Sequence, residues 1–440
     1  MIQDEPRRGA VARGGAARAG DATDAGGTVA TDGATRGTVH GEAGRRGAAG
    51  TSAARGGGAR LAGVDAARGL ALVGMVAVHT LPLWDEASGG ATLSWTLFGG
   101  NAAALFATLA GVSLAFGTGG RTPRTGRRLG AARAAVAARA GVIALVGFLL
   151  GFLELVVDNI LVYYGAFFLL AIPFLGLRIR HLLLGAAVFA LLAPVLMQWS
   201  LTVLPAHVHA NPSLVDLAAE PVTVLSQLLL TGTYPALPWM TFLCAGIAVG
   251  RMDLARRSVQ LGLVASGAVL ALGASVLSAA ALAVFGRDAI LDATPGTSPE
   301  RLQEVVVFGP DPELPTTTLW WLLVPGPHSN TPFSLAVSLG TALCVLGVLL
   351  LLSRPVGRFL LPLAAMGSMT FTLYTAHLLF LWFEVHADAP LPWFWAQAAV
   401  FCGVAVLWRR HVGQGPLEKL VSRVVRGVER RAVARPAGPA

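Results

Sequence analysis

The sequence predicts an all-α protein, a polytopic transmembrane helical bundle of about ten spanning helices with both termini in the cytosol. Three observations predict it. Hydrophobic residues make up 54% of the 440 residues and charged residues only 13%, whereas a soluble domain usually carries about 25% charge. The apolar residues gather in long segments. Basic residues gather in every second connection between those segments.

The apolar segments follow one another from residue 61 onward, and most reach the roughly 20 residues that a helix needs to cross about 30 Å of hydrocarbon. They are 66–84, 96–117, 136–157, 160–177, 182–204, 236–250, 259–285, 333–353, 359–385 and 392–408. The segment 236–250 is short, and we expect it to extend back to Thr231 across Pro235 and Pro238.

Arginine and lysine alternate between the connections. The connections after the second, fourth, sixth and eighth segments are basic, as is the tail after the tenth. Residues 205–231 contain neither Lys nor Arg, and residues 286–330 are acidic. Basic connections stay in the cytosol, so this alternation fixes the expected topology. The net charge of +9 therefore indicates topology and contact with anionic lipid rather than nucleic-acid binding.

Composition divides the chain into three parts. Residues 1–60 are rich in Gly, Ala and Arg, which predicts a disordered cytosolic tail, because such a segment buries too little apolar surface to offset its ordering entropy. Residues 61–410 form the expected membrane domain, and residues 411–440 form a basic cytosolic tail.

The first segment carries ionisable residues that are costly inside a bilayer. Arg68 and His79 are eleven residues apart, so they share one face of a helix at an axial separation of about 16 Å. Asp65 lies one turn before Arg68, where it can pair with the guanidinium. The stripe is either an anchor with a terminal histidine or the wall of a polar interior.

The ninth segment carries a second polar stripe. Thr370, Tyr374 and His377 follow a helical spacing, and Glu384 is expected to continue it. Such residues either make interhelical hydrogen bonds or line a pocket.

Two carboxylates, Glu154 and Asp158, close the third segment at a spacing of four residues, which indicates either one raised pKa or a basic partner. The alternative for Asp158 is a place at the outer interface. Tyr234 and Trp239 are further candidates for a pocket wall. His207 and His209 form an H-x-H pattern with no third ligand nearby, so we expect no metal.

The segment RLAGVDAARGLALVGMVAVH (60–79) resembles the opening of the membrane acyltransferase superfamily, which includes the acyltransferase-3 and the heparan-α-glucosaminide N-acetyltransferase-like proteins. More closely, the chain resembles the DUF418/YeiB-type branch. The supporting segments are GTYPALPWMTFLCAGIAVGR (232–251), HSNTPFSLAVSLGTALCVLGVLLLL (328–352), MGSMTFTLYTAHLLFL (366–381) and GQGPLEKLVSR (413–423). By resemblance, residues 61–205 are heparan N-acetyltransferase-like and residues 225–425 DUF418-like.

The resemblance implies roles for the first stripe. In the acyltransferase-3 group an Arg and a His share the spacing of Arg68 and His79; the His serves acyl transfer and the Arg helps to position acyl-CoA. Asp65 and Arg128 are the other expected donor-binding residues. Heparan-type enzymes instead place their active His in a following HxxWNG-like loop, and here that stretch reads TLPLWDEASGGATLSW without a His. Catalysis is then expected from His79, His377 and Tyr374.

The leading functional hypothesis is an acyltransferase of the plasma membrane. It would move an acyl group, acetyl in the simplest case, from cytosolic acyl-CoA to an amine or hydroxyl of an extracytoplasmic or lipid-linked glycan. Glu154, Asp158, Tyr234, Trp239 and Thr370 are the expected pocket residues, and the loop 286–330 an acceptor lid. The alternatives are a transporter or flippase that uses intramembrane Glu, Asp and His, and a structural membrane subunit.

Overall fold

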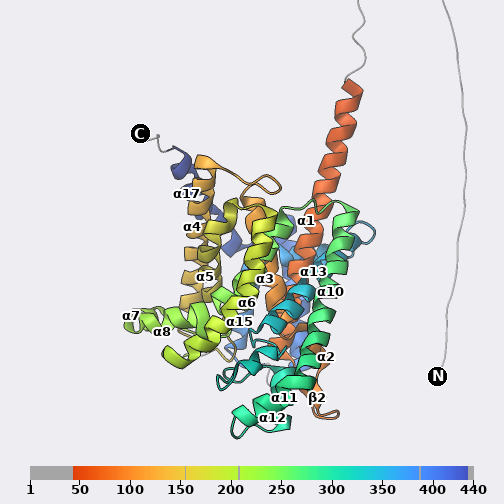
Figure 1. Cartoon of the computed structure of the whole chain (residues 1–440). Helices are drawn as coiled ribbons and strands as arrows, with labels where there is room; N and C mark the ends of the chain where they lie inside the picture. Colours follow the sequence, from red (N-terminus) through yellow and green to blue (C-terminus); the bar gives the residue numbers. More distant parts are fainter. Residues whose placement is uncertain (1–42, 154, 207–208, 386–387, 435–440) are drawn as a thin grey trace, which may run out of the picture. The chain divides into compact units, whose positions relative to one another are not determined.

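The computed structural model describes residues 43–434 except 154, 207–208 and 386–387. The chain divides into two compact units, Met1–Gly50 and Thr51–Ala440. Figure 1 shows the helices of the second unit. Of the expected disordered tail, residues 1–42 lie outside the described part. Residues 43–60 are helical and form the beginning of α1.

The described chain is nearly all helical. In order, its elements are α1 (Ala43–Thr80), β1 (Trp84–Asp85), β2 (Gly90–Ala91), α2 (Leu93–Phe98), α3 (Asn101–Gly117), α4 (Gly126–Leu150), α5 (Leu161–Ala171), η1 (Ile172–Gly176), α6 (Ile179–Val203), α7 (Leu214–Ala219), α8 (Pro221–Ser226), η2 (Gln227–Thr231), α9 (Ala236–Gly250), α10 (Arg257–Ala281), η3 (Leu282–Gly286), α11 (Arg287–Ala293), α12 (Pro299–Phe308), η4 (Leu319–Leu323), α13 (Pro332–Leu352), α14 (Leu361–Gly367), α15 (Thr370–Leu381), α16 (Pro390–His411) and α17 (Pro416–Ala434). The strands β1 and β2 pair antiparallel in the α1–α2 connection.

Seven of the helices described are long and apolar enough to cross a membrane, and nine spans result if each of two bent helix pairs counts as one. Each of the ten expected segments coincides with an element. The fourth is the shorter apolar helix Leu161–Gly176, so a count of ten stays a prediction. The apolar outer face of α10, with Val269 73% and Leu272 68% exposed, suits contact with lipid rather than water.

Paired glycines let the central helices approach closely. Side chains at Gly111 of α3 and Gly246 of α9 would collide with the facing backbone, and each glycine faces the other. Gly267 of α10 and Gly340 of α13 meet in the same way. Helix association in lipid depends on such close backbone packing rather than on burial of apolar surface from water.

Two bends shape the interior. The α8–η2 segment meets α9 at 48° beside Pro235, and α14 meets α15 at 80°. Proline restricts the residue before it to extended backbone and begins a helix well, so α9 starts directly after Pro235. The bend before α15 opens that helix's N-terminus, where Glu418 of α17 accepts hydrogen bonds from Phe371 N at 2.8 Å and Thr372 N at 3.1 Å.

The connection 286–330 is folded rather than an open loop. It contains α11, α12 and η4, which share a small core of their own. Trp321 is 1% exposed at the centre of that core and donates to Thr294 Oγ1 at 3.1 Å. Trp320 is largely exposed.

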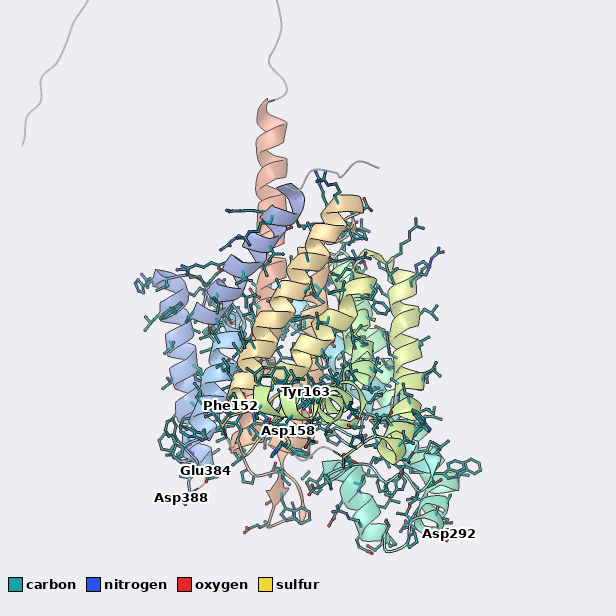
Figure 2. The ribbon with its side chains drawn as sticks, turned by 90° about the vertical axis from the view of Figure 1, so that its left-hand side faces the viewer. Phe152, Asp158, Tyr163, Asp292, Glu384 and Asp388 are labelled. Carbon is teal, nitrogen blue, oxygen red and sulfur yellow. The ribbon has the colours of Figure 1, made fainter. Side chains whose placement is uncertain are left out.

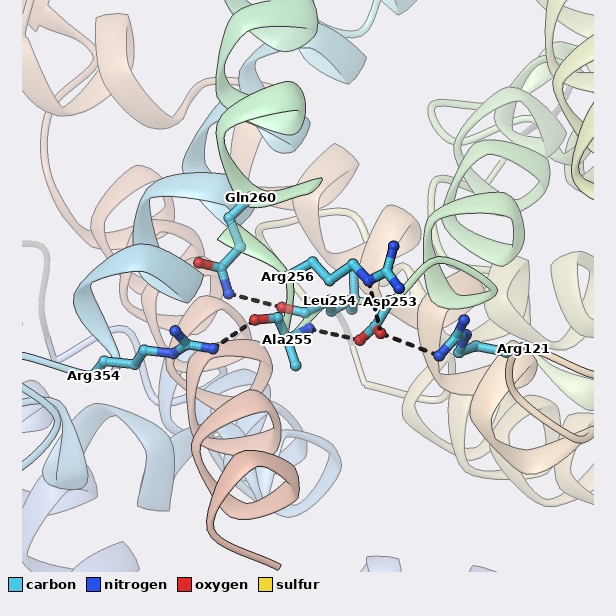
Figure 3. Close-up of polar contacts among 7 residues, drawn as sticks. All are labelled: Arg121, Asp253, Leu254, Ala255, Arg256, Gln260 and Arg354. Atoms are coloured by element: carbon cyan, nitrogen blue, oxygen red, sulfur yellow. Dashed lines mark hydrogen bonds and ion pairs between the residues drawn. The ribbon is translucent and has the colours of Figure 1, made fainter. Parts of the chain in front are cut away.

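At the opposite end, polar contacts join the connection after α9 to two other connections. Asp253 accepts from Arg121 at 3.1 Å and lies 3.5 Å from Arg256 Nε (Figure 3). Beside it, Arg354 donates to Ala255 O at 2.5 Å. The basic residues that the sequence assigns to alternate connections therefore also hold those connections together.

The C-terminal segment, expected as a basic tail, contains the helix α17, which packs along α4 and against α15. Arg124 pairs with Glu429 at 2.5 Å. The labelled carboxylates Asp292, Glu384 and Asp388 lie at the end of the bundle opposite α17, and Asp158 lies in the same half (Figure 2). We call the end of the helical bundle that contains α17 and Asp253 the basic end. The opposite end, which contains the connection 286–330, is the acidic end.

Candidate functional site

A cavity of about 100 Å³, the inner cavity, lies among α1, α3, α4, α5 and α15. Its polar lining consists of Arg68, Ser113, Arg139, Tyr164, Thr370 and Tyr374. Its volume is below the roughly 300–1,000 Å³ of pockets that hold drug-sized ligands. The inner cavity therefore has room for an acyl group and its thioester, but not for a nucleotide.

Arg68 lines the inner cavity, and an ion pair partly neutralises its positive charge. Its Nη1 pairs with Asp65 at 2.5 Å, which confirms the expected pairing, and its Nη2 donates to Ser113 Oγ at 2.6 Å. Ser113 in turn donates to Leu109 O. The guanidinium is thus held in one orientation by two neighbouring helices, α1 and α3.

A second cation, Arg139, lines the same cavity and was missed from the sequence. Its guanidinium lies over the ring of Phe168 at 5.1 Å, and its buried Nε has no hydrogen-bond partner in the part of the chain that the structure describes. Arg128, the expected donor-binding residue, is exposed and lines no part of this cavity. Arg128 lies in the first turn of α4 and Arg139 three turns further along, where the helix enters the bundle.

His79 and His377, the histidine pair, come together from helices 298 positions apart in sequence. Nδ1 of His79 lies 3.0 Å from Nε2 of His377, and their rings are stacked at 5.2 Å with an angle of 4°. Nδ1 of His377 lies 3.0 Å from Oε1 of Gln397 on α16. His377 is 0% exposed.

With the oxygen of Gln397 turned toward His377, the contacts correspond to one assignment of the ring hydrogens. An amide oxygen only accepts, so His377 Nδ1 carries its hydrogen toward Gln397. A neutral His377 then accepts at Nε2 from His79 Nδ1. His79 is left with a lone pair on Nε2, the form that takes up a proton.

The histidine pair lies beside the inner cavity rather than in its wall, so of the first polar stripe only Arg68 lines this cavity. Met75, one turn before His79, takes the wall position on α1. Tyr374 joins the two features. It lines the inner cavity, and its ring centroid lies 6.4 Å from that of His377.

A larger cavity of about 380 Å³, the outer cavity, lies at the acidic end, between the ends of the helices and the 286–330 connection. Asp158, His328 and Asn330 line it together with Trp95 and other residues. Asp158 Oδ2 accepts from Thr233 Oγ1 at 2.7 Å. Its charge also interacts with His328 and with Tyr163, Tyr234 and Tyr374. Asp158 and Tyr163 are labelled in Figure 2.

His328 lies between the two halves of the site. Burial lowers the pKa of its imidazole, and the carboxylate of Asp158 opposes that shift. Its charge interacts with that of His79, so the outer cavity and the histidine pair are electrostatic neighbours. His328 belongs to the HSNTPF segment. The sequence feature that could have predicted its role is a histidine two residues before an asparagine, a residue type that favours turns.

Tyr234 and Trp239 form the wall behind His328. Tyr234 packs its ring edge-on against His328 and Trp239, at 5.2 Å in both cases. Trp239 donates to Asn330 Oδ1 at 2.8 Å. Both side chains are buried and line neither cavity. Their role is to hold His328 and Asn330 in place through the contacts given above.

The expected stripe on α15 is shorter than the spacing indicated. Thr370 and Tyr374 line the inner cavity and His377 joins the histidine pair. α15 ends at Leu381, and Glu384 is exposed with a φ of 54°. Helical spacing does not continue past a helix end, so the expectation for Glu384 is wrong. Glu154 lies outside the described residues.

The described part of the chain contains no group of three or more His, Cys, Asp or Glu side chains able to hold a metal. His209 is mostly exposed, 3.8 Å from Asp216. Hydrogen bonds from Ser213 lower the pKa of Asp216, as in an N-terminal cap of α7. His207 lies outside the described residues.

The model of the family "Heparan-alpha-glucosaminide N-acetyltransferase, catalytic" matches residues 60–288, more than half of the chain. No curated protein matches the chain. The matched segment includes Arg68, His79, Arg139 and Asp158, and it ends before His328 and His377. With its apolar helices and a polar interior, the chain belongs to the heparan-alpha-glucosaminide N-acetyltransferase catalytic family.

Proposed function

We propose that this membrane protein transfers an acetyl group from acetyl-CoA at its basic end to an amine presented at its acidic end. Family membership indicates a membrane N-acetyltransferase whose reaction depends on acetyl-CoA. The observation that carries the proposal is the place of the histidine pair, between an inner cavity that contains two arginines and an outer cavity that contains a carboxylate and a third histidine.

The donor fits the inner cavity by charge and by size. Coenzyme A is anionic, and arginine guanidinium groups bind phosphate well. The cavity of about 100 Å³ accepts only the thioester end, so the nucleotide would stay outside it, at the basic end. Arg139 supplies a cation whose Nε has no partner within the described chain. We place the basic end in the cytosol, where acetyl-CoA is found, following the charge rule for membrane proteins.

His79 performs the proton transfer in this scheme. The contact with His377 leaves a lone pair on its Nε2, and a neutral imidazole is suited to exchange a proton with the reacting groups. Tyr374 lies between the thioester cavity and the pair, where its hydroxyl can donate to the developing oxyanion. The acceptor we propose is a glycan or lipid-linked amine outside the cytosol.

The wider resemblance to the DUF418/YeiB-type and acyltransferase-3 groups remains part of this proposal, as does a plasma-membrane location. The comparisons do not support the transporter alternative. Under the acyltransferase proposal, Asp65 holds Arg68 in place and Thr370 contributes to the wall of the inner cavity.

The test uses the full chain in proteoliposomes with labelled acetyl-CoA and a terminal α-glucosaminide as the probe acceptor. We expect His79→Gln to lower the turnover by a factor of about 10²–10⁴, the usual contribution of a positioned acid–base group. His411→Gln, which changes an exposed histidine at the end of α16, is the control and should retain wild-type turnover. Undiminished transfer by His79→Gln would exclude the role assigned to His79.

A further inference from the structure

We propose that His328 is the base that receives the proton of the acceptor amine in the outer cavity, which makes it a catalytic residue in the half of the chain outside the family match. The inference rests on the proposed function and adds to it the group that activates the acceptor. It stands on the geometry of the HSNTPF segment.

The imidazole of His328 has a ring nitrogen without a hydrogen-bond partner in the described chain. Nδ1 of His328 is buried and has no hydrogen-bond partner among the residues described, although His328 lines the outer cavity. His377 differs, because both of its ring nitrogens are within 3.0 Å of a partner. A histidine that only stabilises packing satisfies its nitrogens as His377 does, since an unmade buried hydrogen bond costs about 1–3 kcal/mol.

The backbone that holds the imidazole of His328 has an uncommon conformation. His328 and Asn330 adopt φ values of 57° and 54°, a conformation that a non-glycine residue adopts rarely and at an energetic cost. The Asn330 side chain fixes it. Its Nδ2 donates to His328 O at 2.9 Å and to Thr233 O at 3.2 Å, while its Oδ1 accepts from Trp239. Such strain persists where the surroundings enforce it, and it is concentrated at functional sites.

The carboxylates around His328 favour a proton on its imidazole. Asp158 lines the same cavity and interacts electrostatically with His328, so a proton arriving on the imidazole is stabilised. Asp311 and Glu313 also line the cavity, and their carboxylates favour an acceptor that arrives as a cation. Arg301 donates to the backbone oxygen of Asp311 rather than to its carboxylate. The groups that face His328 are therefore Asp158, the ring of Tyr234 and the imidazole of His79.

The reaction balances through these groups. A cationic acceptor first releases one proton to the solvent. The neutral amine nitrogen then forms a bond to the carbonyl carbon of the thioester, and the carbon–sulfur bond breaks with its electron pair leaving on sulfur. One amine proton passes to the imidazole of His328 and from there to Nε2 of His79, with which His328 interacts. His79 delivers that proton to the sulfur. The products are an amide and the free thiol.

The experiment compares the wild type with His328→Asn, because Asn is tolerated in the left-handed conformation of residue 328 but does not titrate between pH 5 and 9. His209→Asn, which changes a mostly exposed histidine near the acidic end, is the matched control. Three quantities are measured in proteoliposomes: acetyl-CoA binding, transfer to the α-glucosaminide, and the dependence of transfer on pH.

We expect His328→Asn to bind acetyl-CoA as the wild type does and to lose about 10²-fold or more of its transfer at pH 7. Its rate should rise steadily with pH, because solvent replaces the base, whereas the wild type reaches a plateau. Wild-type transfer by the variant overturns the inference and leaves the proposed function intact. Equal loss of donor binding and transfer also overturns it. If the wild type itself transfers no acetyl group, the proposed function fails and the inference fails with it.

Discussion

The inner and outer cavities lie on either side of one histidine pair, yet they are built in opposite ways. The inner cavity is lined from five helices, contains Arg68 and Arg139, and measures about 100 Å³. The outer cavity measures about 380 Å³, is lined largely by connections, and contains Asp158, Asp311 and Glu313. Opposite charge at the two ends suits an anionic donor and a cationic acceptor. Under the proposed function, this difference means that the acetyl group crosses the membrane by transfer while donor and acceptor stay on their own sides.

The largest expected effect tests the outer cavity. Asp158→Asn removes the charge that stabilises a proton on His328 but keeps an oxygen for Thr233. We expect kcat/KM for the amine acceptor to fall by roughly 10²-fold, since an opposite charge nearby shifts a pKa by about 1–3 units and each unit corresponds to about tenfold. KM for acetyl-CoA should not change. Steady-state kinetics with each substrate varied in turn measures this, and an effect confined to the donor would reverse the assignment of the two cavities.

The second prediction tests the inner cavity with two arginines of one helix. Arg139→Gln should raise KM for acetyl-CoA roughly tenfold, equivalent to about 1.4 kcal/mol of lost binding. KM for the acceptor should stay at its wild-type value. Arg128→Gln, an exposed position three turns earlier on α4, is the control and should leave both constants nearly unchanged. If Arg128→Gln has the larger effect, the sequence-based assignment is right and the cavity assignment is wrong.

The smallest effect concerns α15, which lines the inner cavity and carries His377 of the histidine pair. Glu418 caps the N-terminus of α15 through Phe371 N, Thr372 N and the Thr372 hydroxyl. Glu418→Ala should lower the free energy of unfolding by about 1 kcal/mol, as for other helix caps, and should lower turnover only a few-fold because Tyr374 and His377 shift with α15. Thermal unfolding and turnover are both measured. Glu304→Ala, an exposed partner of Arg301, should change neither; a Glu418→Ala protein with wild-type stability contradicts the capping role.

Particular residues show how far the sequence leads. The pairing of Asp65 with Arg68 follows from helical spacing alone and is confirmed. Asp158 lines the outer cavity, and its role as a substrate-pocket residue stays a prediction. Spacing failed for Glu384, since it does not show where a helix ends. Spacing also gave no basis for choosing between Arg128 and Arg139, because both lie on α4. Only the packing of the bundle shows that Arg139 lines the inner cavity and that Arg128 does not. His328 was missed because its importance depends on a backbone conformation and on Asp158, 170 positions earlier in the chain.

The sequence by itself determined the class of protein, because the excess of apolar residues and the alternation of basic connections are properties of the chain that need no folding to be present. It also determined the first polar stripe, since helix periodicity is local. Only the tertiary structure decided which polar groups meet. A buried imidazole or guanidinium needs partners to offset its desolvation, and His377 finds them on α1 and α16. Those partners lie far apart in sequence, so the packing of the helices brings them together.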